Sequence, residues 1–124
     1  MGDRALIVFH DDDGEVSPTV YLHWNGEDVQ NMLEAALPRM RKGDVSYSCA
    51  RFIGECHARL NGNTSLGVFN TTVPLEGCKQ SDFSPGDAGV FLVDVNTWRV
   101  EAFNGYGFAH GEMSLQLDAA QVSH

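Results

Sequence analysis

Two segments near the amino terminus that favour strands, separated by a polar turn, predict a β-hairpin. Residues 4–10 and 16–23 are rich in β-branched and aromatic side chains, and an Asp-Gly turn signal at 13–14 separates them. A turn at this point pairs Ile7 with Val20 in an antiparallel ladder. The apolar side chains expected on one side of the hairpin are Ala5, Ile7, Phe9, Val20 and Leu22.

The next segment has the period of a helix. Apolar side chains recur at spacings of three and four, the pattern of one buried helical stripe, at Val29, Met32, Leu33, Ala36, Leu37 and Met40. Pro38 is expected to kink or shorten this helix, because its ring clashes with the carbonyl group four residues earlier.

A second helix is predicted from a cap at Asp44 or Ser46 to an end near residues 61–62. Its apolar stripe is Cys49, Phe52, Ile53, Cys56 and Leu60. Its exposed side carries an i, i+4 series of charges at Arg51, Glu55 and Arg59. Gly54 lies in the middle of this helix, where glycine is unfavourable, so we predict that it allows a neighbouring element to pack closely against the helix.

Strand patterns return after residue 64, at 65–70, 89–95 and 98–103, with the last two joined as a hairpin. Residues 71–87 form a long irregular loop, and the tail 104–124 is loop-rich with one short strand near 113–117. The predicted fold class is α+β, in a single domain 1–124. We expect an antiparallel sheet of about five strands with two helices on one face, in the order ββααβββ.

Composition agrees with one globular domain, since the 124 residues are 43% hydrophobic and 20% charged. No apolar run approaches the roughly 20 residues that cross a bilayer, so no membrane association is expected. Cys49 and Cys56 would lie two helical turns apart, too far for a disulfide bond, and three cysteines cannot all pair with one another. A reducing, cytoplasmic location is therefore expected.

The formal net charge of −9 is distributed unevenly. Residues 1–38 hold eight carboxylates against one arginine, which gives −7, and residues 60–124 hold seven against two basic residues, which gives −5. Residues 39–59 hold five basic residues against two carboxylates, which gives +3. A field of this sign repels nucleic acid and attracts a basic surface, although acidic surfaces also serve solubility alone.

Catalytic and metal chemistry find little support in the residues. Cys56 and His57 could supply a thiol and its base, but adjacent helical residues point about 100° apart, and both helical cysteines lie on the apolar stripe. The five histidines form no local ligand pair, and the run 11–15 lacks the distal glutamate of a calcium loop. The glycines at 105, 107 and 111 do not open a helix after a strand, as phosphate cradles do. We therefore expect no cofactor, no metal and no catalytic residue.

Two groups of side chains remain as candidates for binding a partner. The first group is acidic and consists of Asp11, Asp12, Asp13, Glu15, Glu27, Asp28 and Glu34. The second is aromatic and consists of Tyr106 and Phe108 with Phe103, backed by Trp98. The alternative is a solvated acidic face and aromatic side chains buried in the core.

Three blocks carry a resemblance: SPTVYLHWNG (17–26), SYSCARFIGECHARLNGNTSLGVF (46–69) and GDAGVFLVDV (86–95). They resemble small proteins encoded on phages, prophages and plasmids of proteobacteria, and they span roughly half the chain. Membership of this group implies an accessory gene of a mobile element, where small acidic domains often resemble anti-CRISPR or other anti-defence inhibitors. No functional residue can be carried over from this resemblance.

The leading hypothesis is a non-enzymatic inhibitor whose carboxylates occlude a basic nucleic-acid-binding surface of a partner protein, such as a CRISPR effector subunit, without contacting nucleic acid itself. One alternative is a small enzyme with a pocket between the helices and the loop 71–87, using His57, Arg51 or Asp87. Another is an immunity or antitoxin-like protein. A homodimer is also considered, because the +3 segment of one copy could face the acidic segment of another.

Overall fold

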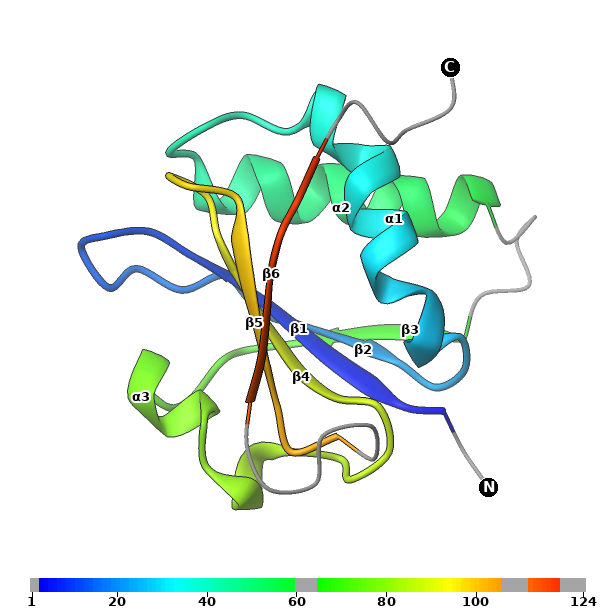
Figure 1. The fold of residues 1–124 in the computed structure, drawn as a ribbon, viewed down its shortest axis with the longest axis vertical. Helices are drawn as coiled ribbons and strands as arrows, with labels where there is room; N and C mark the ends of the chain where they lie inside the picture. The colour runs from blue at the N-terminus through cyan, green and yellow to red at the C-terminus, as the bar shows by residue number, and fades with distance from the viewer. Residues whose placement is uncertain (1–2, 60–64, 106–111, 119–124) are drawn as a thin grey trace.

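The computed structural model describes residues 3–59, 65–105 and 112–118, and it has an α+β fold built on one mixed sheet (Figure 1). Its strands are β1 (Ala5–His10), β2 (Thr19–Leu22), β3 (Leu66–Phe69), β4 (Gly89–Asp94), β5 (Arg99–Phe103) and β6 (Glu112–Gln116). Its α-helices are α1 (Val29–Ala36), α2 (Val45–Arg59) and α3 (Leu75–Cys78). Short 3₁₀ turns are η1 (Gly26–Asp28), η2 (Leu37–Arg39) and η3 (Ser81–Phe83). Within the described ranges, no helix combines the length and apolar composition needed to cross a bilayer.

The strands lie in the order β3-β2-β1-β4-β5-β6. The two central strands, β1 and β4, are parallel, with Ala5 opposite Gly89 and His10 opposite Asp94, while the other neighbours are antiparallel. The predicted sheet of five antiparallel strands was therefore wrong in detail, since a sixth strand is present and the two hairpins meet in parallel. The order along the chain also differs, because α3 lies between β3 and β4.

The first hairpin confirms the predicted register. Ala5 pairs with Leu22 and Ile7 with Val20, and the five apolar side chains predicted on one side all belong to the same buried core. The last pair of the hairpin is an isolated bridge between His10 and Val16. Residues 11–15 therefore form the connection, which is longer than a two-residue turn.

The helices cover one face of the sheet. Phe52 of α2 is fully buried, and its ring lies 5.8 Å from that of Phe9 on β1. The apolar stripe of α1 is buried as predicted, and the α-helix ends at Ala36, where η2 with its Pro38 takes over. Asp44 caps α2 by accepting a hydrogen bond from the backbone N–H of Tyr47 at 3.0 Å, so the helix begins at the first of the two predicted caps.

The second face of the sheet is also buried, under residues predicted to be an irregular loop. Alternate side chains of the central strands, among them Leu6 and Leu92, pack there against Cys78 of α3 and the half-buried Leu75 and Phe83. In Figure 1, α3 lies on the opposite side of the sheet from α1 and α2. The length of the segment 71–87 therefore has a structural reason, because it supplies the apolar cover that a sheet face needs.

Two interpretations of α2 were wrong. Gly54 is exposed, and a methyl group built on it would meet no atom within 4 Å, so the glycine does not serve close packing. The charge series does not form either, because Glu55 receives Arg39 of η2 at 3.3 Å and Arg51 binds the hydroxyl group of Tyr47. Leu60 and the predicted helix end lie outside the described residues.

The carboxyl-terminal strands agree with the pattern. The hairpin of β4 and β5 forms as predicted, with Asp94 accepting the backbone N–H groups of Asn96 at 2.8 Å and Thr97 at 3.3 Å. The strand expected near residues 113–117 is β6, which pairs with β5 at the edge of the sheet.

Candidate functional site

The hairpin tip, residues 11–15, is an acidic turn whose conformation is fixed by its own first residue. The carboxylate of Asp11 accepts hydrogen bonds from the backbone N–H groups of Asp13 at 2.9 Å and Glu15 at 3.0 Å. Asp12, Asp13 and Glu15 are exposed, and in the described part of the chain none of these three carboxylates forms an ion pair. The tip therefore presents negative charge to solvent from an ordered backbone.

Asn96 joins the hairpin tip to two other segments at the same end of the sheet. Its side-chain oxygen accepts the backbone N–H of Asp12 at 3.1 Å, across 84 positions of sequence. The adjacent carbonyl of Val95 accepts the backbone N–H of Gly43 at 3.0 Å, so the loop before α2 is bound to the same turn. The tip, the β4–β5 turn and the loop before α2 thus converge at one end of the molecule (Figure 1).

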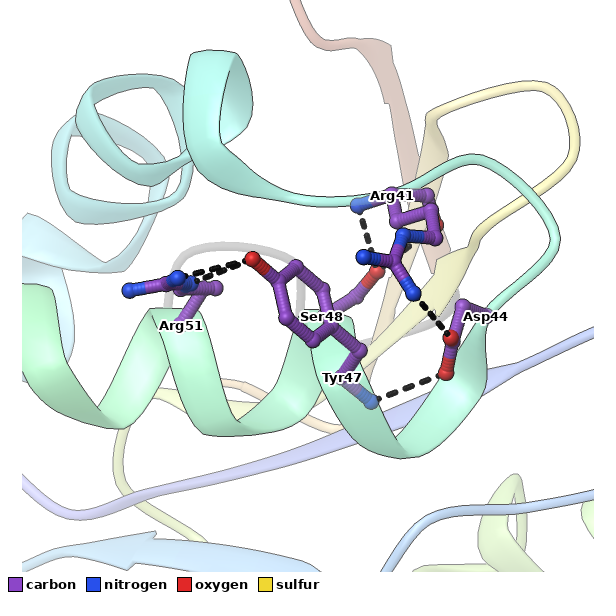
Figure 2. A network of polar contacts seen from close by, with 5 residues as sticks. All are labelled: Arg41, Asp44, Tyr47, Ser48 and Arg51. Carbon is purple, nitrogen blue, oxygen red and sulfur yellow. Dashed lines mark hydrogen bonds and ion pairs between the residues drawn. The ribbon is translucent and has the colours of Figure 1, made fainter.

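Next to this junction lies the arginine–tyrosine cluster, which consists of Arg41, Tyr47 and Arg51 (Figure 2). The Arg41 guanidinium group lies over the Tyr47 ring at 4.2 Å from its centroid, and the Arg51 guanidinium group lies at 4.9 Å. Arg51 also donates two hydrogen bonds to the Tyr47 hydroxyl oxygen, from Nε at 3.0 Å and from Nη2 at 2.7 Å. Cation–π contact and hydrogen bonding together hold two long cationic side chains at the surface.

The backbone under the cluster is fixed by Ser48 and Asp44. The buried hydroxyl group of Ser48 donates to the carbonyl of Arg41 at 3.0 Å and accepts the Arg41 N–H at 3.3 Å. Asp44, which caps α2, also receives Arg41 Nη1 at 3.4 Å. Sequence reasoning missed this cluster, although Tyr47 and Arg51 are an i, i+4 pair that a helix places side by side.

The predicted acidic residues are not brought together. Glu27 and Asp28 belong to η1, where Gly26 and Glu27 donate backbone hydrogen bonds to Asp3 at the start of β1. That is the opposite end of the sheet from the hairpin tip, about 25 Å away along β1 at 3.3 Å per residue. Glu34 is 9% exposed and accepts the backbone N–H of Asp118 at 3.1 Å, so it contributes to internal structure.

The predicted aromatic group is also divided. Trp98 packs against the core under the helices, whereas Phe103 packs on the other face of the sheet, so Trp98 does not back Phe103. Tyr106 and Phe108 lie outside the described residues. The aromatic side chains that the described surface exposes are Trp24, at 50%, and Phe69, at 46%.

The structure separates the parts of the predicted enzyme pocket. The sheet lies between α2, which carries Arg51 and His57, and the residues of 73–83 that pack on its other face. Asp87 pairs with Arg4 at 2.7 Å, and the hydrogen bond from Arg4 lowers the pKa of the Asp87 carboxyl group. Among the described residues, no three His, Cys, Asp or Glu side chains gather as a metal site.

Burial suppresses the reactivity of the three cysteines. Cys49 and Cys56 lie in the core under the helices and Cys78 lies in the core on the other face. Desolvation raises the pKa of all three thiols, and that of Cys56 reaches about 12. The thiolate that a nucleophile requires is therefore disfavoured at neutral pH, and the burial of Cys49 and Cys56 confirms the prediction that these two residues belong to the core.

Comparison of the chain with protein-family models, with curated proteins and with solved structures finds no match in any of the three.

Proposed function

We propose that the chain is a non-enzymatic binding protein that occludes a basic nucleic-acid-binding surface of another protein, with the hairpin tip as its contact. The observation that supports this most is the state of Asp12, Asp13 and Glu15. Their carboxylates are exposed and are not neutralised by an ion pair in the described structure, and they project from a turn held by Asp11 and Asn96.

A fixed turn reduces the cost of binding. Side chains and loops that become ordered in a complex lose conformational entropy, and that loss is subtracted from the affinity. Here the backbone is already ordered, because Asp11 accepts two backbone N–H groups and Asn96 accepts a third. The three carboxylates can therefore meet lysine and arginine side chains without further folding.

The partner is proposed from its chemistry. A protein that handles nucleic acid carries a groove of lysine and arginine side chains for phosphate groups, and an ordered row of carboxylates can occupy the same groove. The chain's net charge of −9 speeds the encounter with such a surface and repels the nucleic acid itself. With the resemblance to proteins of mobile elements, this favours an anti-CRISPR or similar anti-defence inhibitor.

The test is inhibition of nucleic-acid binding by a panel of purified CRISPR effector complexes. The wild-type chain should compete with DNA or guide RNA, and competition should weaken as ionic strength increases. The variant Asp12→Lys/Asp13→Lys should bind at least about tenfold more weakly, because both charges at the contact are reversed. Asp11 is left unchanged, since its carboxylate holds the turn.

The matched control is Glu27→Lys/Asp82→Lys, which changes the net charge equally at exposed positions outside the tip. It should lower the association rate slightly and leave the complex intact. An equal loss of binding in both variants would mean that net charge alone causes the effect. Competition by the tip variant at the wild-type level would refute the tip as the contact. An antitoxin-like protein would give the same dependence on the tip with a toxin as its target.

A further inference from the structure

The arginine–tyrosine cluster and the hairpin tip place charges of opposite sign side by side at one end of the sheet. The turn between β4 and β5 connects them, because Asn96 binds the backbone of Asp12 and the preceding Val95 accepts the backbone N–H of Gly43, two positions from Arg41. In the described structure the carboxylates of the tip form no ion pair with these arginines. The end of the molecule is therefore divided into an acidic half and a basic half.

The basic half is prepared to bind a carboxylate. Both guanidinium groups are held against Tyr47, and the Arg41 side chain is 63% exposed. A guanidinium group has five N–H donors, of which the contacts in Figure 2 use one in Arg41 and two in Arg51. Donors remain on both arginines for charge-assisted, bidentate bonds to acceptors outside the molecule.

A polyanion is a poor occupant for this cluster. Phosphate groups of a nucleic acid bound there would lie at the same end of the molecule as Asp12 and Asp13, whose carboxylates would repel them. A better occupant carries its own positive charges to set against the acidic half. The same end of a second copy of this chain meets both requirements.

We propose that the arginine–tyrosine cluster binds the hairpin tip of a second copy, in a two-fold symmetric dimer. A patch with acidic and basic halves side by side is complementary to itself after a two-fold rotation, because each half then faces its opposite. Two equivalent tip–cluster contacts form at once, and Asn96 lies near the axis. This association does not depend on the proposed inhibitory function, although a basic partner would compete for the tip.

Salt alone is a poor test of the dimer, because two copies of net charge −9 repel each other at long range while the contacts attract at short range. Exchange of charges separates the two effects. The tip variant Asp12→Lys/Asp13→Lys makes the net charge of the chain less negative, so it reduces the long-range repulsion, yet it should abolish the dimer. The cluster variant Arg41→Glu/Arg51→Glu should also be monomeric.

An equimolar mixture of the two variants is the decisive sample. In the mixed dimer the lysines of one tip face the glutamates of one cluster, and the native acidic tip faces the native arginines. Analytical ultracentrifugation at micromolar concentrations should show a dimer for wild type and for the mixture, and at least about tenfold weaker association for each variant alone. A monomeric wild type, or variants that associate as wild type does, would overturn the proposal.

A second measurement does not need the cluster variant to fold. Lys42 follows Arg41 in the chain and is exposed, so it can report on the cluster. Carbodiimide treatment of an equal mixture of ¹⁴N- and ¹⁵N-labelled wild-type protein should link Lys42 to Asp12 or Asp13 in peptide pairs of mixed isotope composition. Pairs of a single isotope alone would mean that the links form within one copy, and would contradict the dimer. Inhibition of a nucleic-acid-handling partner should survive in the cluster variant, which separates failure of the dimer from failure of the proposed function.

Discussion

The two faces of the sheet are buried to a similar degree but covered by different kinds of structure. On one face, α1 and α2 bring a continuous set of fully buried side chains, among them Phe52 and Leu33, against β1 and its neighbours. On the other face, the four-residue α3 and the loop around it supply Cys78 with the half-buried Leu75 and Phe83. One face is therefore covered by the helices α1 and α2. The other face is covered by a segment of short elements, residues 73–83, which we call the strap.

This difference predicts that the two coverings of the sheet differ in their resistance to local unfolding. Long helices open with the whole domain, whereas a short strap with half-buried anchors can detach while the rest stays folded. The candidate binding end depends on the helix face, since Tyr47 and Arg51 belong to α2. Loosening of the strap should therefore leave the arginine–tyrosine cluster in place.

The largest expected effect is the loss of an aromatic side chain from the helix face. Phe52→Ala should lower the free energy of unfolding by about 3–5 kcal/mol, because it removes a fully buried ring and leaves a cavity beside Phe9. The matched change on the other face, Leu75→Ala, should cost about 1–2 kcal/mol, because Leu75 is half-buried. Urea unfolding followed by circular dichroism measures both, and equal losses would contradict the contrast between the faces.

The next largest effect is a difference in the reaction rates of the cysteine thiols on the two faces of the sheet. At pH 8, Cys78 should react with a thiol reagent at least about 100-fold faster than Cys56, because it needs release of the strap alone. Cys49, under the helices, is the control and should follow Cys56. Site-resolved mass spectrometry gives the rates, and equal rates at all three would show that the domain opens as one unit.

The same thiols set a pH dependence of stability. Their pKa values are raised in the folded state, to about 12 for Cys56, so the folded protein retains protons that the unfolded chain loses. The stabilising effect is complete below the ordinary thiol pKa of about 8.5 and is lost as the pH rises toward the folded value. The free energy of unfolding should therefore decrease above about pH 8.5.

The smallest expected effect is an increase in the free energy of unfolding, from a substitution on the solvent-facing side of α2. Gly54→Ala should increase the free energy of unfolding by about 1 kcal/mol, because the methyl group enters open space and the glycine costs helix stability. Gly89→Ala is the contrasting control, since Gly89 has φ +94° and a methyl group there would collide with the Phe103 carbonyl oxygen. Thermal unfolding should place the first variant above wild type and the second below it.

Much of the local structure was predictable from periodicity and turn chemistry. The register of Ile7 with Val20 followed from the turn signal, and the end of α1 followed from Pro38. The parallel pairing of β1 with β4 was not predicted, since Ala5 and Gly89 lie 84 positions apart in the chain. The unbroken apolar run of β1 was a usable signal, because such runs are typical of strands covered on both faces.

The candidate site divides in the same way. The acidity of residues 11–15 is evident from the sequence, and Tyr47 with Arg51 could be paired from helical spacing. The separation of Glu27 from the tip could not be predicted, because it depends on which end of the sheet each turn occupies. The place of Arg41 over Tyr47 depends on Ser48, which ties a non-helical residue to the helix.

The sequence by itself determined the local features of the structure, which are the hairpin register, the helix stripes and the acidic turn. These features depend on hydrogen bonding and side-chain direction over a few neighbouring positions. The tertiary structure alone decided which faces of the sheet are covered, which carboxylates share an end, and that the β4–β5 turn joins the acidic tip to the segment before α2. These contacts cross many tens of residues, where no local period constrains the chain and the burial of two apolar faces selects the arrangement.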